Sequence, residues 1–179
     1  KNHLTMSLFN HQAIWPESPE LWPRGFYCNG HILVDSVKMS KSEGNFFTMK
    51  QILELYGADA TRVALADSGD SMEDANFVHK SADTAVLRLF TLYDWISEQA
   101  KQSSSWRNTS TEVPSEIAFY DNVFKNEIAQ VIEDCREAYE SMRFRDVLKR
   151  GFYDFSKMKE DYKHHVSAAG MRQDLVINY

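Results

Sequence analysis

The apolar positions near the start of the chain change spacing from helical to strand-like. Residues 3–14 carry apolar side chains at helical spacing, and Trp15-Pro16 would end that helix. Residues 26–34 are rich in aromatic and β-branched side chains, which predicts a strand. Asn-Gly is also typical of hairpin turns. A turn at Asn29-Gly30 would divide this segment into two short strands, so both interpretations stay open.

A second helical pattern follows a polar stretch. Thr48 and Gln51 match a capping box, so we expect a helix to begin at Thr48. Gly57 suits the position just after a helix and should end this one. A further helix is predicted over residues 58–67, and the acidic residues 67–74 should form a turn.

The rest of the chain has helical periodicity almost throughout. We expect one long helix from Asp74 past Ile96, a second over residues 116–142 and a third over residues 143–165. Residues 103–114 are the clearest linker, and a last helix should start at Met171. The predicted fold class is therefore mostly α with a small α/β part, the long helices forming an up-and-down array.

Composition narrows the function classes. The chain has 179 residues, 43% of them hydrophobic, and a net charge of −6, which argues against a general nucleic-acid coat. No apolar stretch approaches the roughly 20 residues of a membrane span, and no secretory signal is present. The first residue is not Met and the last residues look helical, so we expect a piece of a longer protein.

Cysteine and histidine positions give no metal-binding spacing. Cys28 and Cys135 lie far apart, and the pair His164-His165 has no partner cluster, so no metal site is predicted. Buried free thiols in a reducing compartment are the simpler interpretation.

The segment with the most chemical content is Lys38-Met39-Ser40-Lys41-Ser42, which continues as Glu43-Gly44-Asn45. It lies between the predicted strand and the helix at Thr48. Lysine supplies a point charge for phosphate oxygens, and glycine and serine let a backbone close over a ligand. Runs of this composition are usually solvated loops. Only the exact order of residues can therefore favour a phosphate-binding loop over an ordinary solvated one.

That string resembles the second signature of the class I aminoacyl-tRNA synthetases. The resemblance continues through residues 56–62, and residues 67–77 resemble the leucine branch in its cytosolic eukaryotic and archaeal form. Residues 2–15 and 22–31 are also similar to that branch. The resemblance implies that residues 1–72 are the end of a Rossmann-type catalytic domain with the signature loop and stem-contact-like helices. Residues 73–179 would begin an anticodon-binding-type helical bundle, here incomplete.

The resemblance also implies an activity. The parent would activate leucine with ATP, accompanied by Mg²⁺, and transfer it to tRNA(Leu) in the cytoplasm. Lys41 first and Lys38 next would be the catalytic residues. The ATP-binding residues would be Lys38, Met39, Ser40, Lys41, Ser42, Asn29 and His31. Because the first signature motif and the amino-acid pocket lie elsewhere, these residues alone should be inactive.

Several assignments keep their alternatives. Met39 fits an apolar anchor better than a chemical role. Asp59 and Arg62 match the family pattern but equally suit ordinary helix-start chemistry. A basic cluster could contact tRNA or be a solvated face, since Asp146 and Asp154 interrupt it. Its members are Arg143, Arg145, Lys149 and Arg150.

Other functions also stay open. The isolated piece could be a non-catalytic module that binds tRNA or protein, and the parent could instead act on valine, isoleucine or methionine. Other synthetases or scaffold proteins are further candidate partners, whereas a membrane is not expected.

Overall fold

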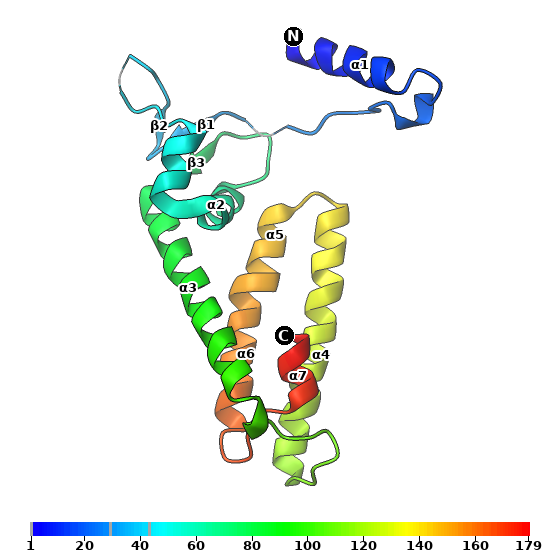
Figure 1. The fold of residues 1–179 in the computed structure, drawn as a ribbon, viewed down its shortest axis with the longest axis vertical. Helices are drawn as coiled ribbons and strands as arrows, with labels where there is room; N and C mark the ends of the chain where they lie inside the picture. Colours follow the sequence, from blue (N-terminus) through cyan, green and yellow to red (C-terminus); the bar gives the residue numbers. More distant parts are fainter. Residues whose placement is uncertain (1, 29, 43) are drawn as a thin grey trace.

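The structure is a computed structural model that describes residues 2–28, 30–42 and 44–179. These residues are mostly helical and contain one small three-stranded sheet, as the sequence predicts (Figure 1). The elements in chain order are α1 (Asn2–Ile14), η1 (Pro19–Leu21), β1 (Ile32–Val34), β2 (Val37–Lys38), α2 (Met49–Ser68), β3 (Ala75–Phe77), α3 (His79–Lys101), η2 (Ser103–Ser105), α4 (Ser115–Glu140), α5 (Phe144–Leu148), η3 (Lys149–Asp154), α6 (Phe155–His165) and α7 (Gln173–Asn178). η1 and η2 are short 3-10 turns, and η3 is a π-helical segment.

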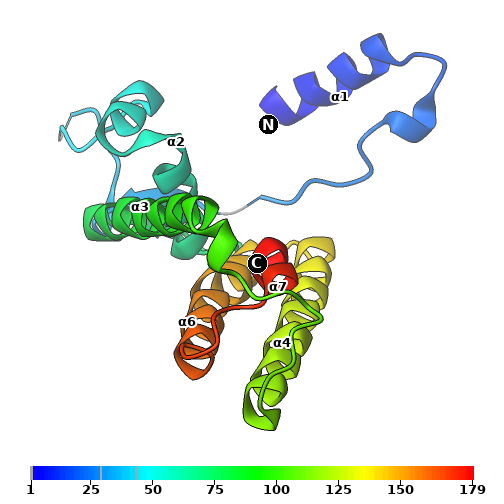
Figure 2. The ribbon, with the colours of Figure 1, turned by 60° about the horizontal axis from the view of Figure 1, so that its bottom comes forward.

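A sheet-containing part and a group of long helices are joined by α3 (Figure 1). α2 packs against α3 beside the sheet, and α4 packs against α6 and α7 (Figure 2). The helix predicted over residues 3–14 is confirmed as α1, which lies apart from the other helices in both views. Its apolar side chains are largely exposed, among them Met6, Phe9 and Ile14.

The sheet has the strand order β2–β1–β3. β1 and β2 form an antiparallel hairpin whose turn residues, Asp35 and Ser36, have positive φ angles of 47° and 67°. This is the backbone that a two-residue hairpin with right-handed strand twist requires. The strand predicted over residues 26–34 is therefore wrong in length, and its hairpin turn lies at 35–36. Phe26 and Tyr27 stay outside the sheet with exposed side chains, and Asn29 falls outside the described residues.

β3 is a strand where the sequence predicted the start of a helix. It pairs parallel to β1, with Leu33 opposite Asn76, and buries Ala75 and Phe77 on one face. The predicted helix therefore begins at His79, not at Asp74. The physical reason is tertiary: an apolar–polar–apolar triplet suits a strand or a helix, and pairing with β1 decides.

α2 begins as its sequence predicts. The Gln51 amide donates to Thr48 Oγ1 at 3.2 Å, and the Thr48 amide donates to Gln51 Oε1 at 2.8 Å, which completes a capping box. Gly57 has φ 76° and ψ 168°, so the backbone kinks there and two helical segments follow each other. Both the helix start at Thr48 and the break at Gly57 are confirmed.

Replacing Thr48 with alanine should lower the free energy of unfolding by about 0.5–2 kcal/mol, because the amides at the start of α2 lose their cap. The measurement is urea denaturation of the 179-residue chain followed by circular dichroism. Thr84→Ala is the matched control, since Thr84 lies inside α3 and its hydroxyl only donates to the Lys80 carbonyl. Equal stability changes for the two variants would contradict the capping role.

Two apolar clusters form the core of the described residues. One lies between the sheet, α2 and α3, and the other between α4, α6 and α7. The buried members of the first are Ala64, Phe77 and Ala82. Those of the second are Phe124, Ile128, Tyr162, Val166 and Leu175.

The long helices largely follow the predicted pattern. α4 matches the helix predicted over residues 116–142 to within two residues. The single helix predicted over residues 143–165 is one helical run, but its middle, η3, is π-helical. Gly151 lies in η3 against Cys135 of α4, where an added Cβ would approach Sγ to 2.9 Å. Across the described residues, no helix combines the length and apolar composition needed to cross a membrane.

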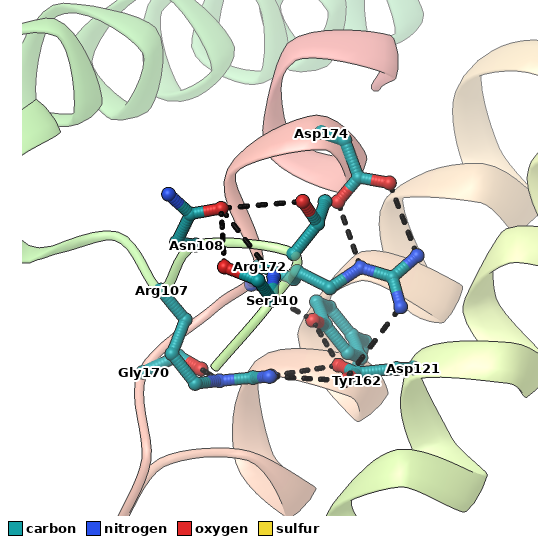
Figure 3. A network of polar contacts seen from close by, with 9 residues as sticks. Arg107, Asn108, Ser110, Asp121, Tyr162, Gly170, Arg172 and Asp174 are labelled. Carbon is teal, nitrogen blue, oxygen red and sulfur yellow. Dashed lines mark hydrogen bonds and ion pairs between the residues drawn. The ribbon is translucent and has the colours of Figure 1, made fainter. Parts of the chain in front are cut away.

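The predicted linker over residues 103–114 contains a buried anchor. Arg107 is only 7% exposed and forms a bidentate ion pair with Asp121 of α4, at 3.0 and 2.7 Å (Figure 3). Its Nε also donates to the Gly170 carbonyl at 2.9 Å. The segment connects α3 to α4 as a linker would, and a buried charge within it must be paired. Arg107 therefore also fastens this segment to α4 and to the loop before α7.

The same carboxylate binds further groups around it. Tyr162 donates its hydroxyl to Asp121 at 2.7 Å and accepts from the Arg172 amide at 3.0 Å. Burial raises the pKa of Tyr162, so the phenol keeps the proton that it donates. Arg172 lies 3.9 Å from Asp121 and is held by Asp174 (Figure 3). We call these five residues, Arg107, Asp121, Tyr162, Arg172 and Asp174, the buried polar network.

The loop over residues 69–74 is held at several points. The Asp70 carboxylate accepts from the Arg145 amide at 2.9 Å, at the start of α5. The Asp70 carbonyl accepts from the Tyr27 hydroxyl at 2.7 Å, and the Glu73 carbonyl accepts from the Gly30 amide at 3.1 Å. A Cβ on Gly30 would come within 2.5 Å of the Asp74 carboxylate, so only glycine fits. This loop thus connects the sheet, α5 and the segment before β1.

Candidate functional site

The segment between β2 and α2 lies at one end of the molecule, and we call residues 38–45 the lysine loop (Figure 1). Lys38 ends β2, and Thr48 caps α2 after the loop. Both Lys38 and Lys41 are exposed. The strand before and the helix after therefore fix the two ends of a short cationic segment.

Asn45 holds the backbone of this loop. Its Oδ1 accepts from the Ser40 amide at 2.7 Å, and its Nδ2 donates to the Lys38 carbonyl at 3.0 Å. One side chain thus bonds the backbone on both sides of Met39. Gly44 beside it has φ 74°, a conformation that favours glycine.

Met39 is less exposed than the two lysines beside it. It is half-buried and lines an apolar cavity of about 100 Å³ beneath the loop. The other lining residues are Ile32, Val34, Phe47, Thr48, Met49, Ile52, Thr61, Leu65 and Phe77. This is the position that an apolar anchor for the loop requires.

Both lysines of the loop carry a positive charge on an exposed side chain. No carboxylate among the described residues forms an ion pair with Lys38 or Lys41. Lys41 Nζ lies 5.5 Å from the centre of the Phe46 ring, a cation–π contact that leaves the ammonium accessible. The loop can therefore offer positive charge to an anion.

The hydroxyls of Ser40 and Ser42 lie 2.7 Å apart and bond each other. Only one hydroxyl hydrogen is used in that bond, so the other remains able to donate. These side chains provide a hydroxyl donor beside Lys41.

A second pair of side chains lies beside Phe47, which follows the lysine loop in the chain. The Tyr56 hydroxyl and His79 Nδ1 lie 2.6 Å apart, and Phe47 packs edge-on against the His79 ring. Burial raises the pKa of Tyr56, with Asp83 and Asp35 adding to the effect, so the phenol stays neutral. α2 and α3 are thereby joined next to the loop.

The two predicted residues before β1 have different outcomes. Asn29 lies outside the described residues. His31 is exposed, and its amide donates to the Asp74 carboxylate at 2.7 Å, while its Nδ1 lies 3.7 Å from the same oxygen. The structure thus gives His31 a local partner in the 69–74 loop.

The predicted basic cluster divides into two kinds of residue. Arg143 pairs with Asp146 at 2.8 Å, and Arg150 pairs with Asp134 at 2.6 Å, so carboxylates neutralise both. Arg145 and Lys149 are exposed and form no ion pair within the described part of the chain. Any free positive charge of the cluster rests on these two.

The other predicted pair, Asp59 and Arg62, forms an exposed ion pair at 3.1 Å within α2. Such a pair is ordinary helix-surface chemistry.

Metal-binding groups and thiols add no further site. Within the described ranges, no three His, Cys, Asp or Glu side chains gather as a metal ion would need. Cys135 is half-buried, and burial, together with Asp134, raises the pKa of its thiol. Cys28 is exposed, so the prediction that both thiols are buried is wrong for Cys28.

Asn45 is the residue that sequence reasoning passed over. It stood in the signature string, yet no role was assigned to it. The available signal was its type: asparagine beside glycine in a loop bonds nearby backbone groups.

Comparison with known proteins agrees with the predicted resemblance. Residues 9–88 match a protein family described as "tRNA synthetases class I (M)". The chain is 41% identical over 178 residues to "Leucine--tRNA ligase, cytoplasmic" of Pongo abelii and 42% identical to the putative enzyme of Schizosaccharomyces pombe. It is 39% identical to the Saccharomyces cerevisiae enzyme. Each alignment covers 99% of this chain but only 15% of the relative.

Proposed function

Because this chain carries a class I tRNA synthetase segment and is related along its whole length to cytoplasmic leucine–tRNA ligases, we propose that it supplies such an enzyme with its ATP-phosphate loop. The observation that carries the proposal is a pair of exposed lysines on a loop that Asn45 bonds and Met39 anchors. No carboxylate in the part of the chain that the structure describes pairs with either lysine. The parent would join leucine to tRNA(Leu), in the cytoplasm where its relatives' names place them.

The chemistry explains why lysines suit this role. In activation, a carboxylate oxygen of leucine attacks the α-phosphorus of ATP, and the bond to pyrophosphate breaks. Negative charge grows on the leaving group, so cations that contact it more strongly in the transition state raise the rate. Lys41 would make the main contact and Lys38 the second.

Neighbouring groups complete the proposed binding site. The free hydroxyl hydrogen of the Ser40–Ser42 pair would donate to a phosphate oxygen. Met39 would hold the loop down, and Asn29 and His31 would lie toward the adenosine. Mg²⁺ enters with ATP as part of the substrate, since it binds mainly through phosphates and water.

The finer architecture belongs to the same proposal. Residues 1–72 would be the end of a Rossmann-type domain, and residues 73–179 the beginning of an up-and-down, anticodon-binding-type bundle that contacts tRNA. Arg145 and Lys149 are the side chains best suited to meet tRNA phosphates, since carboxylates occupy Arg143 and Arg150. Other synthetases or scaffold proteins as partners remain a prediction.

The test is ATP–pyrophosphate exchange by the full-length enzyme that contains this segment. Leucine should support exchange, whereas valine, isoleucine and methionine should have kcat/KM values lower by at least about 10-fold, the usual effect of a misfitted aliphatic side chain. Exchange with one of these amino acids but not with leucine would refute the assignment. Residues 1–179 alone should give no exchange, and measurable exchange would contradict the incomplete site.

A further inference from the structure

We propose that Asn45 is a positioning residue for leucine activation, because its amide fixes the backbone from which Lys38 and Lys41 extend. This inference rests on the function proposed above and assigns it a residue beyond the lysines. Asn45 would not contact ATP, and it would act only through the loop that it holds.

The first step concerns the strand pairing of β2, which ends where the lysine loop begins. The β1–β2 ladder ends at the pair Leu33–Lys38, so no strand partner fixes the chain after Lys38. From this point the Asn45 side chain bonds the backbone, with one hydrogen bond to the Lys38 carbonyl and one from the Ser40 amide. It uses a donor and an acceptor at once, as a strand partner would.

The second step concerns which side chains face outward. Between the two bonded groups lies Met39, which is half-buried and lines the apolar cavity together with residues of β1 and α2. A backbone rotation here would bring Met39 out and turn a lysine inward. By bonding both sides of Met39, Asn45 keeps the methionine inward and leaves both ammonium groups exposed.

The third step concerns the cost of a loose loop. Gly44 and two serines give this segment many accessible conformations. Without Asn45, the loop would have to be ordered while charge develops on the phosphates, and that cost falls on the transition state. We therefore expect a lower kcat, with little change in the KM for leucine.

The experiment uses the full-length enzyme and leucine-dependent ATP–pyrophosphate exchange. Asn45→Ala should lower kcat by about 10- to 100-fold, as expected for two lost hydrogen bonds. The KM for leucine should change less than about threefold, because the loop is proposed to contact ATP phosphates and not leucine. Asn45→Asp keeps the acceptor for the Ser40 amide and loses the donor to the Lys38 carbonyl. The kcat of this variant should lie between that of the wild type and that of Asn45→Ala.

Asn76→Ala is the matched control. Like Asn45, Asn76 forms two hydrogen bonds through its side chain. Its Oδ1 accepts from the Ser36 backbone amide at 2.7 Å, and its Nδ2 donates to the Ser36 hydroxyl at 3.1 Å. It supports the β1–β2 turn and not the lysine loop, so its kcat should stay near that of the wild type. An Asn45→Ala enzyme equal to the Asn76→Ala enzyme would overturn the inference.

A double-mutant cycle separates positioning from general stability. If Asn45 acts through Lys41, adding Asn45→Ala to Lys41→Ala should cost much less than it costs the wild type. Fully additive losses would show a merely structural role. Absence of leucine-dependent exchange in the wild type would refute the proposed function itself, whereas a normal wild type with an unaffected Asn45→Ala refutes only this inference.

Discussion

Lys41→Ala in the full-length enzyme is expected to lower kcat for leucine activation by about 100- to 1,000-fold, the usual effect of losing one preorganised contact to developing charge. The structure gives Lys41 no carboxylate partner within the described residues, so its charge is free for the phosphates. The contact forms mainly in the transition state, so kcat and kcat/KM should fall together.

The measurement is steady-state exchange with leucine and ATP varied in turn. Lys50→Ala is the control, because Lys50 is an exposed lysine of α2 that pairs only with Glu54, at 3.8 Å. Lys41→Arg should recover part of the rate, since it keeps the charge but changes its shape. A Lys41→Ala enzyme as fast as the Lys50→Ala enzyme would remove Lys41 from its role.

The second large effect concerns stability. Asp121→Ala should lower the free energy of unfolding by about 3–5 kcal/mol, because it leaves the buried Arg107 charge without its partner. The same change removes the acceptor of the Tyr162 hydroxyl. Among the described residues, the Gly170 carbonyl is then the one acceptor that still bonds the buried guanidinium.

Urea denaturation of the 179-residue chain measures this change. The dependence of the free energy of unfolding on urea concentration should be the same in the variant and the wild type. Asp59→Ala is the control: its carboxylate pairs with Arg62 on the surface, where such pairs contribute about 0–1 kcal/mol. If both variants lose the same stability, the buried polar network does not hold the helices together.

Local sequence signals predicted the parts of the fold that depend on near neighbours. Thr48 and Gln51 lie three residues apart, and Gly57 acts on its own backbone, so both ends of the first helical segment were readable. β3 was missed because its identity depends on pairing with β1, which lies far earlier in the chain, with Ile32 opposite Ala75. A triplet such as Ala75–Phe77 has no periodicity long enough to exclude a helix.

The site divides in the same way. The signature string identified Lys38 and Lys41 by type. Their exposure, and the lack of ion pairs with any described carboxylate, depend on the fold around them. The neutralised state of Arg143 and Arg150 depends on Glu137, Asp146, Asp134 and Asp154, whose side-chain directions the sequence does not give. Arg107 looked like part of a polar linker because its partner Asp121 lies 14 residues later, on α4.

The loop over residues 69–74 has a consequence for how the chain can vary in length. Exposed connecting loops usually accept insertions and deletions. Here Asp70 bonds α5, and Glu73 bonds the glycine before β1, so both ends of a very short stretch are fixed to different elements. One extra residue would shift one of these bonds out of register. Homologous chains that keep both contacts should therefore keep this loop at constant length, however much its exposed side chains differ.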